Sequence, residues 1–256
     1  MDRSSSADAT RQIANLVGAV AQAVAPALGI GLGLDIGSVS DENRTTIVPA
    51  DYAFAIWGPI FLLTLAYAAF QALPAQRANP LLRRVGWGTA AAFFCNAAWE
   101  LLYPARQYVL SEMVFVGIWL GLAVAYRAAV VEAGAATRTE RALVALPVGL
   151  MLGWITAAKI VDLASALVGL GFDREGGAAA LTAAGKRGPV AGWLPYAGAV
   201  VWALAAVAIE HASGTPTTAA TAGALILLIV GVAAFVRLPD NRGWSVGGRT
   251  AEPRAT

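Results

Sequence analysis

Charged residues are scarce in this chain. Asp, Glu, Lys and Arg make up 13% of its 256 residues, whereas apolar residues make up 58% and the mean hydropathy is +0.63. A soluble domain of this composition would expose large apolar patches, so the composition indicates an integral membrane protein. The basic residues form no stripe along the chain, which argues against nucleic acid as a partner.

Cysteine and histidine are nearly absent. Cys95 is the single cysteine, so no internal disulfide can form, and its apolar surroundings indicate a packing role. His211 is the single histidine and follows Glu210 at the end of an apolar run. We find no pattern typical of a nucleophile, a set of metal ligands or a phosphate-binding loop. The sequence therefore predicts no catalytic residues, no metal site, no required cofactor and no enzyme activity.

Long apolar runs make up most of the sequence. There are seven of them, and each can cross a hydrocarbon core of roughly 30 Å as a helix. They cover residues 13–34, 52–70, 85–103, 108–126, 143–170, 193–209 and 218–236. No sustained alternation typical of a barrel is found. The predicted fold class is therefore an all-α integral membrane protein, a bundle of about seven transmembrane helices.

Polar segments divide the chain into five parts. We expect a polar tail over residues 1–12, a five-helix membrane domain over 13–170 and a loop over 171–191. Two further transmembrane helices follow within 192–237, and a second polar tail covers 238–256. The first apolar run is longer than the core of a signal peptide, which favours an uncleaved helix.

The second apolar run carries Trp57, Gly58 and Pro59 about one and a half turns from its start. Pro59 removes a backbone hydrogen bond and Gly58 leaves the backbone uncovered, which predicts a kink or close packing here. Trp57 is the large flat side chain beside this turn. The alternative is an ordinary Trp of the interfacial aromatic belt.

Three charged residues interrupt the apolar runs, namely Glu100, Lys159 and Asp162. Each costs a few kcal/mol at the bilayer centre unless it is paired or faces a cavity. Lys159 and Asp162 are three residues apart and share a helix face, so we expect them to form an ion pair, joined by Glu100. A purely structural pair with an interfacial glutamate is the alternative.

Three motifs in order resemble a known family. The first is P-x-x-Y-x-F-x-x-W at Pro49, Tyr52, Phe54 and Trp57, and N-x-x-W follows at Asn96 and Trp99. The third is a proline followed by W-x-x-x-A, at Pro147, Trp154 and Ala158. Together they resemble the tryptophan-rich sensory proteins, the TspO/MBR and translocator protein family. The match is greatest to longer bacterial relatives in which two helices follow the five-helix unit.

The resemblance implies a five-helix bundle with an internal pocket for tetrapyrroles such as protoporphyrin or haem. The ligand-binding residues that it implies here are Tyr52, Phe54, Trp57, Asn96, Trp99, Trp154, Ala158 and Asp162. Trp faces hold a flat apolar macrocycle well, and a few polar groups orient its edge. The chain departs from the family at Tyr52, where Trp is preferred, and at Asp162, where Asn is usual, with Lys159 one turn before it.

Two functions therefore stay open. The chain is either a ligand-binding sensor, receptor or carrier, or a small transporter with an ion or proton pathway through Glu100, Lys159 and Asp162. A retinal protein using Lys159 is disfavoured, because the lysine lies on the fifth helix and not the last. Light-dependent porphyrin degradation is implied by the resemblance alone.

The expected location is the bacterial inner membrane, which the chain crosses several times. The expected partners are the lipid bilayer, a small apolar ligand and a second copy of the chain in a homodimer. The arginines up to the fifth helix favour an N-terminus on the cytoplasmic side, whereas the four arginines of the C-terminal tail point the other way if there are seven helices, so the orientation stays open.

Overall fold

The computed structural model describes residues 3–45, 47–131, 136–171, 194–214, 218–219 and 222–223. Over these residues the chain forms helices and no strand, which confirms the predicted all-α class. The long helices are α1 (Arg3–Gly31), α3 (Trp57–Ala72), α4 (Pro80–Leu102), α5 (Tyr108–Val131), α7 (Leu146–Gly169) and α9 (Leu194–Glu210). The short ones are α2 (Ile36–Glu42), η1 (Asp51–Ile56), η2 (Pro74–Gln76), α6 (Arg138–Glu140) and the π-helical turn η3 (Arg141–Ala145).

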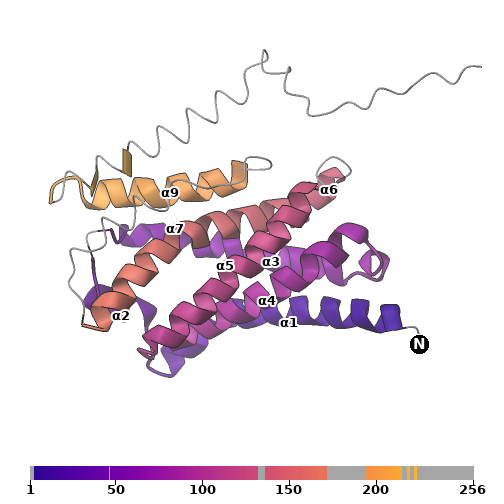
Figure 1. The fold of residues 1–256 in the computed structure, drawn as a ribbon, viewed down its shortest axis with the longest axis horizontal. Coiled ribbons are helices and arrows are strands. Elements are labelled where there is room, and N and C mark those ends of the chain that lie inside the picture. The colour runs from indigo at the N-terminus through magenta and orange to yellow at the C-terminus, as the bar shows by residue number, and fades with distance from the viewer. Residues whose placement is uncertain are drawn as a thin grey trace, which may run out of the picture.

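The contacts among five long helices close into a ring. Figure 1 shows these helices from the side, lying lengthwise in the bundle. Helix α1 packs against α3 and α4, α4 against α5, α5 against α7, and α7 against α3. Their inward side chains form one hydrophobic core, with Tyr67, Phe93, Phe115, Ile118 and Trp154 among its largest members. Helix α9 lies along α7 on the outside of the ring.

Helices α4 and α5 approach each other closely at two glycines. A Cβ built on Gly88 would lie 2.6 Å from the carbonyl oxygen of Gly121, and the reverse distance is also 2.6 Å. Small residues of this kind let two membrane helices pack backbone against backbone.

Polar side chains join α1 to its two neighbours. Arg11 donates from Nη1 to Oε1 of Gln71 at 2.9 Å, and Thr89 donates to Oδ1 of Asn15 at 2.6 Å. The hydroxyl groups of Tyr67 and Thr89 lie 2.8 Å apart. These bonds satisfy polar groups that would otherwise be costly in an apolar environment.

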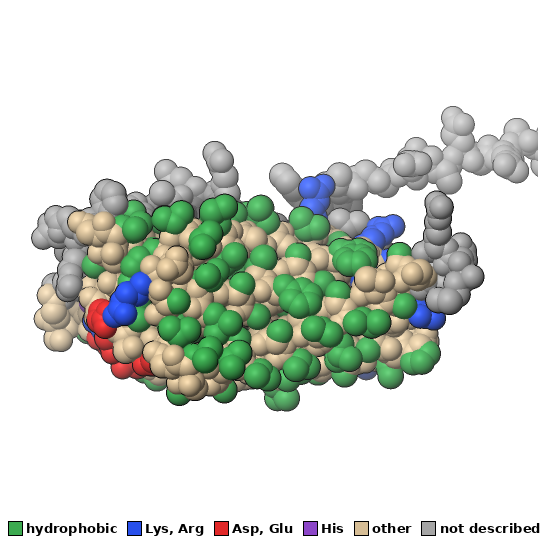
Figure 2. All heavy atoms as spheres, turned by 90° about the horizontal axis from the view of Figure 1, so that it is seen from below, with side chains coloured by type: hydrophobic (Ala, Val, Ile, Leu, Met, Phe, Trp, Pro, Cys, Tyr) green, Lys and Arg blue, Asp and Glu red, His purple; other side chains and the backbone are tan. Residues whose placement is uncertain are grey.

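The surface and the length of the helices suit a membrane. Four segments are long and apolar enough to cross one, namely Ser6–Gly31, Asp51–Ala72, Tyr108–Val130 and Arg138–Gly169. Helix α4 is 23 residues long but less apolar, and α9 is a shorter apolar helix. Figure 2 shows hydrophobic side chains along the length of one face, with charged side chains gathered toward its ends.

The two ends of the ring differ in charge. We call one end the arginine end, because the polar segments there carry Arg77, Arg83, Arg84, Arg138 and Arg141. Contacts of Arg11 with Arg77, and of Asn79 with Glu140, bring its segments together. The other end, the α2 end, holds α2 and the turn at residues 103–107, joined by a salt bridge between Glu42 and Arg106.

The first six predicted spans each lie on a described helix, and the sixth corresponds to α9. The seventh, residues 218–236, lies almost entirely outside the described residues. The expected close packing at Gly58 was wrong, and Pro59 lies just after the change from the 3₁₀ helix η1 to α3. Helix α3 begins at Trp57, so Pro59 lies in its first turn, where proline is tolerated. A Cβ built on Gly58 meets nothing within 4 Å.

Candidate functional site

Four aromatic side chains gather where α3 begins, beside the middle of α7. The rings of Trp57 and Trp154 meet edge to face, with centroids 6.3 Å apart. Phe54 meets Trp154 in the same way at 6.0 Å, and Phe61 stacks on Trp57 at 5.2 Å. We call these four residues the aromatic cluster. It runs from the partly exposed Phe54 to Trp154, which is 2% exposed.

Trp154 is buried with its indole N–H unused. Nε1 of Trp154 donates to no acceptor among the described residues. A buried donor without an acceptor costs about 1–3 kcal/mol. This N–H is therefore a group that a hydrogen-bond acceptor on a ligand would satisfy.

One face of α7 leads from the aromatic cluster to charged residues. Trp154, Ala158 and Asp162 are spaced by four residues and so lie along one face. Ala158 is small and packs against the core. Asp162 is 6% exposed, and its Oδ1 accepts a hydrogen bond of 3.1 Å from Nε1 of Trp99.

The partner of Lys159 differs from the one expected. Lys159 forms its salt bridge with Glu112 of α5, not with Asp162. Its Nζ also lies 5.0 Å from the ring centroid of Phe115, within the range of a cation–π contact. The expected participation of Glu100 in this pair was also wrong, because Glu100 accepts a hydrogen bond of 3.0 Å from Asn96. Glu112 was missed although it is a charge inside the predicted span 108–126.

A segment before α3 is held by α9. Trp202 donates from Nε1 to the carbonyl oxygen of Ala53 at 3.0 Å, and its ring meets that of Tyr52 at 5.7 Å. These contacts place Tyr52 against α9, whereas Phe54, two residues later, reaches the aromatic cluster.

Arg44 links the same segment to α9 through three carboxylates. It bonds Asp41 and Asp51 at 3.0 Å each, and Glu210 of α9 at 2.9 Å. The hydrogen bond to Asp41 is the main cause that raises the pKa of the Arg44 guanidinium, so this group keeps its charge. The α2 end is thus tied to α9 by one cation.

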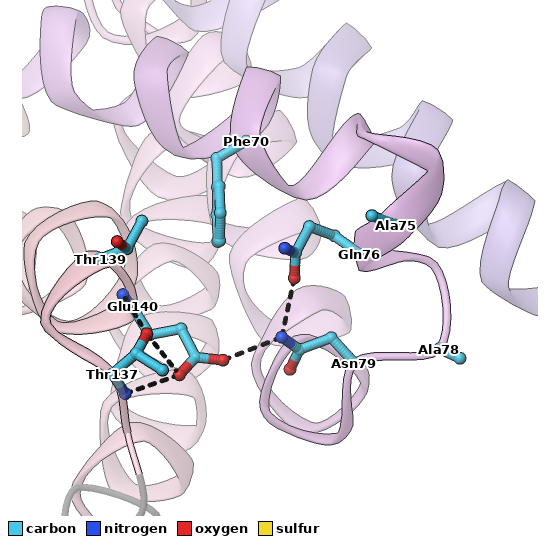
Figure 3. A pocket seen from close by; sticks show the side chains of 8 residues that line it. All are labelled: Phe70, Ala75, Gln76, Ala78, Asn79, Thr137, Thr139 and Glu140. Atoms are coloured by element: carbon cyan, nitrogen blue, oxygen red, sulfur yellow. Dashed lines mark hydrogen bonds between the residues drawn. The ribbon is translucent and has the colours of Figure 1, made fainter.

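Two hollows of the described surface lie away from the aromatic cluster. A cleft of about 610 Å³ opens at the arginine end (Figure 3). Its polar side chains bond one another, with Asn79 joined to Gln76 and Glu140 at 2.8 Å each, and Glu140 capping its own helix with Thr137. A second hollow of about 500 Å³, between α1 and α4, is apolar, with Val17, Val20 and Leu101 among its lining residues.

The predicted ligand-binding residues fall into two groups, with three residues outside them. Phe54, Trp57 and Trp154 meet directly, and Trp99 and Asp162 meet directly. Ala158 lies between the two groups on α7. Asn96 bonds Glu100, and Tyr52 lies apart against Trp202. Their role in ligand binding stays a prediction. The described residues contain no group of His, Cys, Asp or Glu side chains that could hold a metal ion.

These features define a class of protein. The chain is an α-helical integral membrane protein whose long helices enclose aromatic and acidic side chains. The profile of the TSPO-like protein family matches residues 12–185, more than half of the chain, so the chain belongs to this family. No curated protein and no solved structure matches the chain.

Proposed function

We propose that this protein is a membrane sensor, receptor or carrier that binds a flat, largely apolar ligand of tetrapyrrole type at the aromatic cluster. The contact between Trp57 and Trp154 carries the proposal. The motifs that contain these residues lie 97 positions apart, and yet their rings meet. Aromatic walls suit a flat ring, and the unused N–H of Trp154 offers a hydrogen bond for its edge.

The test is a titration of the detergent-solubilised protein with protoporphyrin and haemin, followed by Trp fluorescence and porphyrin absorption. We expect saturable quenching with a Kd of about 1 μM or lower, which corresponds to roughly 8 kcal/mol of binding free energy. Replacing both rings, with Trp57→Ala and Trp154→Ala, should weaken binding at least about tenfold, because aromatic contacts contribute about 0.5–1.5 kcal/mol each beyond their buried area.

Two single substitutions sharpen this test. Trp154→Phe keeps a ring and removes the N–H, so we expect a loss of about two- to tenfold in affinity. Trp87→Phe is the matched control, because Trp87 is 50% exposed on α4. Unchanged emission on adding protoporphyrin, its neutral ester and its ammonium-bearing amide, or equal binding by the double variant, would refute the proposal.

A transport function is the second candidate. The salt bridge between Lys159 and Glu112 favours it, because this pair lies near Asp162 and retains 22% and 19% side-chain exposure. Intramembrane ionisable groups often mark ion or proton pathways. Proteoliposomes with a trapped pH dye would report proton flux driven by a potassium diffusion potential. Flux that persists at the same rate in Lys159→Met would exclude this pathway.

A further inference from the structure

The interior of the ring holds more carboxyl groups than cationic groups. In the half of the ring toward the α2 end, the described long helices place four charged side chains inside the ring or at the contacts between helices. They are Glu100 near the end of α4, Glu112 near the start of α5, and Lys159 and Asp162 on α7. Lys159 is already bonded to Glu112. Glu100 and Asp162 are 2% and 6% exposed, and neither forms a salt bridge with a described residue.

Several buried side-chain oxygen atoms, one of them on Glu100, accept no hydrogen bond from a described residue. Oε1 of Glu100 accepts from Asn96, but its Oε2 accepts no hydrogen bond from any described residue. The same is true of Oδ1 of Asn96 and Oε1 of Gln22, whose side chains are both 0% exposed. Oδ2 of Asp162 is a further acceptor of this kind.

The pairing of α1 with α4 brings Gln22 to the level of Asn96. Both helices start at the arginine end and run in the same direction. Thr89 bonds Asn15, and a Cβ on Gly18 would lie 3.1 Å from Cβ of Phe93. On the contacting faces of the two helices, the next residues along are Gln22, four residues after Gly18 on α1, and Asn96, three residues after Phe93 on α4.

Donors near these oxygens are already used. Nε2 of Gln22 donates to Oγ1 of Thr64 at 3.0 Å, and Thr64 in turn donates to the carbonyl oxygen of Ile60 at 2.9 Å. Nδ2 of Asn96 donates to Glu100. Burying an acceptor without a donor, and a carboxylate without a counter-charge, is costly. Among the described residues, the surroundings of Glu100 are therefore short of hydrogen-bond donors and of positive charge, whereas Asp162 lies near Lys159.

We propose that the ligand of this site carries a positive charge with N–H donors on one edge, such as a flat ring bearing a protonated amine, and that Glu100 and Asp162 select for that charge. This inference rests on the proposed function, because it concerns the ligand of the same interior. Aromatic faces at Trp57 and Trp154 also attract cations. A ring with free carboxylates, such as protoporphyrin with its two propionates, is disfavoured by the same two acids.

The experiment compares three forms of one macrocycle: protoporphyrin with free carboxylates, its neutral dimethyl ester, and its bis(aminoethyl) amide, which carries two ammonium groups. The probes share the ring and differ in the charge of their side chains. We expect the ammonium form to bind at least tenfold more tightly than the carboxylate form, with the ester between them, at fixed pH and ionic strength. In Glu100→Gln and in Asp162→Asn, the ratio of the two affinities should fall by at least threefold.

The ratio is measured within each variant, so a general loss of stability does not change the result. Asp35→Asn is the matched control, because Asp35 is an exposed N-cap of α2 and Asn caps equally well. Equal binding of the three forms, tighter binding of the carboxylate form, or an unchanged ratio in both variants overturns the inference while leaving the proposed function intact. If none of the three forms binds, the proposed function fails and the inference fails with it.

Discussion

Single side chains set the chemistry of the interior, and sequence spacing identified only some of their partners. The spacing of Lys159 and Asp162 permits contact on one helix, and the two lie near each other. Which carboxylate Lys159 bonds depends on the position of α5, which spacing within α7 does not contain. Glu112 lies only four residues after the start of α5, where an interfacial acid is common. Its location inside an apolar run was nevertheless a signal for a partner.

We expect Lys159 and Glu112 to be coupled in stability. Lys159→Ala or Glu112→Ala alone leaves a charge without its partner in a partly buried place, whereas the double change removes both charges. The double change should therefore cost less unfolding free energy than the sum of the two single changes. We expect a coupling energy of about 1–3 kcal/mol, measured by reversible denaturation in detergent micelles.

The matching cycle with Lys159→Ala and Asp162→Ala serves as the comparison. Asp162 is bonded to Trp99, so its coupling to Lys159 should be smaller than that of Glu112. Strict additivity for Lys159 and Glu112 would mean that the salt bridge contributes nothing to stability.

At the scale of helices, the apolar runs predicted the existence and type of every long helix that the structure describes. Their ends were less predictable, because they depend on local backbone chemistry. Helix α3 begins at Trp57 after the 3₁₀ turn η1, although the apolar run continues without a break from Tyr52. The short helices α2 and α6 depend on caps, at Asp35 and Thr137, and carry no long apolar pattern.

The contact between α4 and α5 yields a prediction for Gly121. In Gly121→Ala the new Cβ would meet the backbone oxygen of Gly88 at 2.6 Å, and backbone atoms cannot move aside as a flexible side chain can. We expect the unfolding free energy to fall by about 1–3 kcal/mol, the usual cost of overpacking. Gly58→Ala is the control, since its Cβ meets nothing within 4 Å and alanine favours helix. Equal stability of the two variants would contradict the close approach of α4 and α5.

At the scale of the whole molecule, the sequence did not predict which helices are neighbours around the ring. Each helix is apolar on most sides, so its pattern does not say which neighbour it faces. The meeting of Trp57 with Trp154 depends on α3 lying beside α7, which the resemblance implied and the spacing did not. The buried oxygen atoms of Gln22 and Asn96 depend in the same way on the register between α1 and α4.

The charge difference between the two ends predicts how the ring is oriented in a membrane. The polar segments at the arginine end carry five arginines, Arg77, Arg83, Arg84, Arg138 and Arg141, of which Arg83 is bonded to Asp8. The described segments at the α2 end carry two, Arg44 and Arg106, both bonded to carboxylates. Arginine in short loops favours the cytoplasmic side. We therefore expect the N-terminus of α1, the turn at η2 and helix α6 to be cytoplasmic, with α2 on the opposite side.

Single cysteines report this orientation directly. In a Cys95→Ser background, Gly37→Cys places a thiol on exposed α2, and Ala75→Cys places one on exposed η2. The two positions lie at opposite ends of the ring, so only one of them faces the outside of a sealed vesicle. A membrane-impermeant maleimide added to right-side-out vesicles should label Gly37→Cys and spare Ala75→Cys until the vesicles are opened with detergent, and inside-out vesicles should give the reverse. Labelling of Ala75→Cys alone in right-side-out vesicles would mean that the arginine end faces outward. Labelling of both in sealed vesicles would contradict a bundle that crosses the bilayer between these two ends.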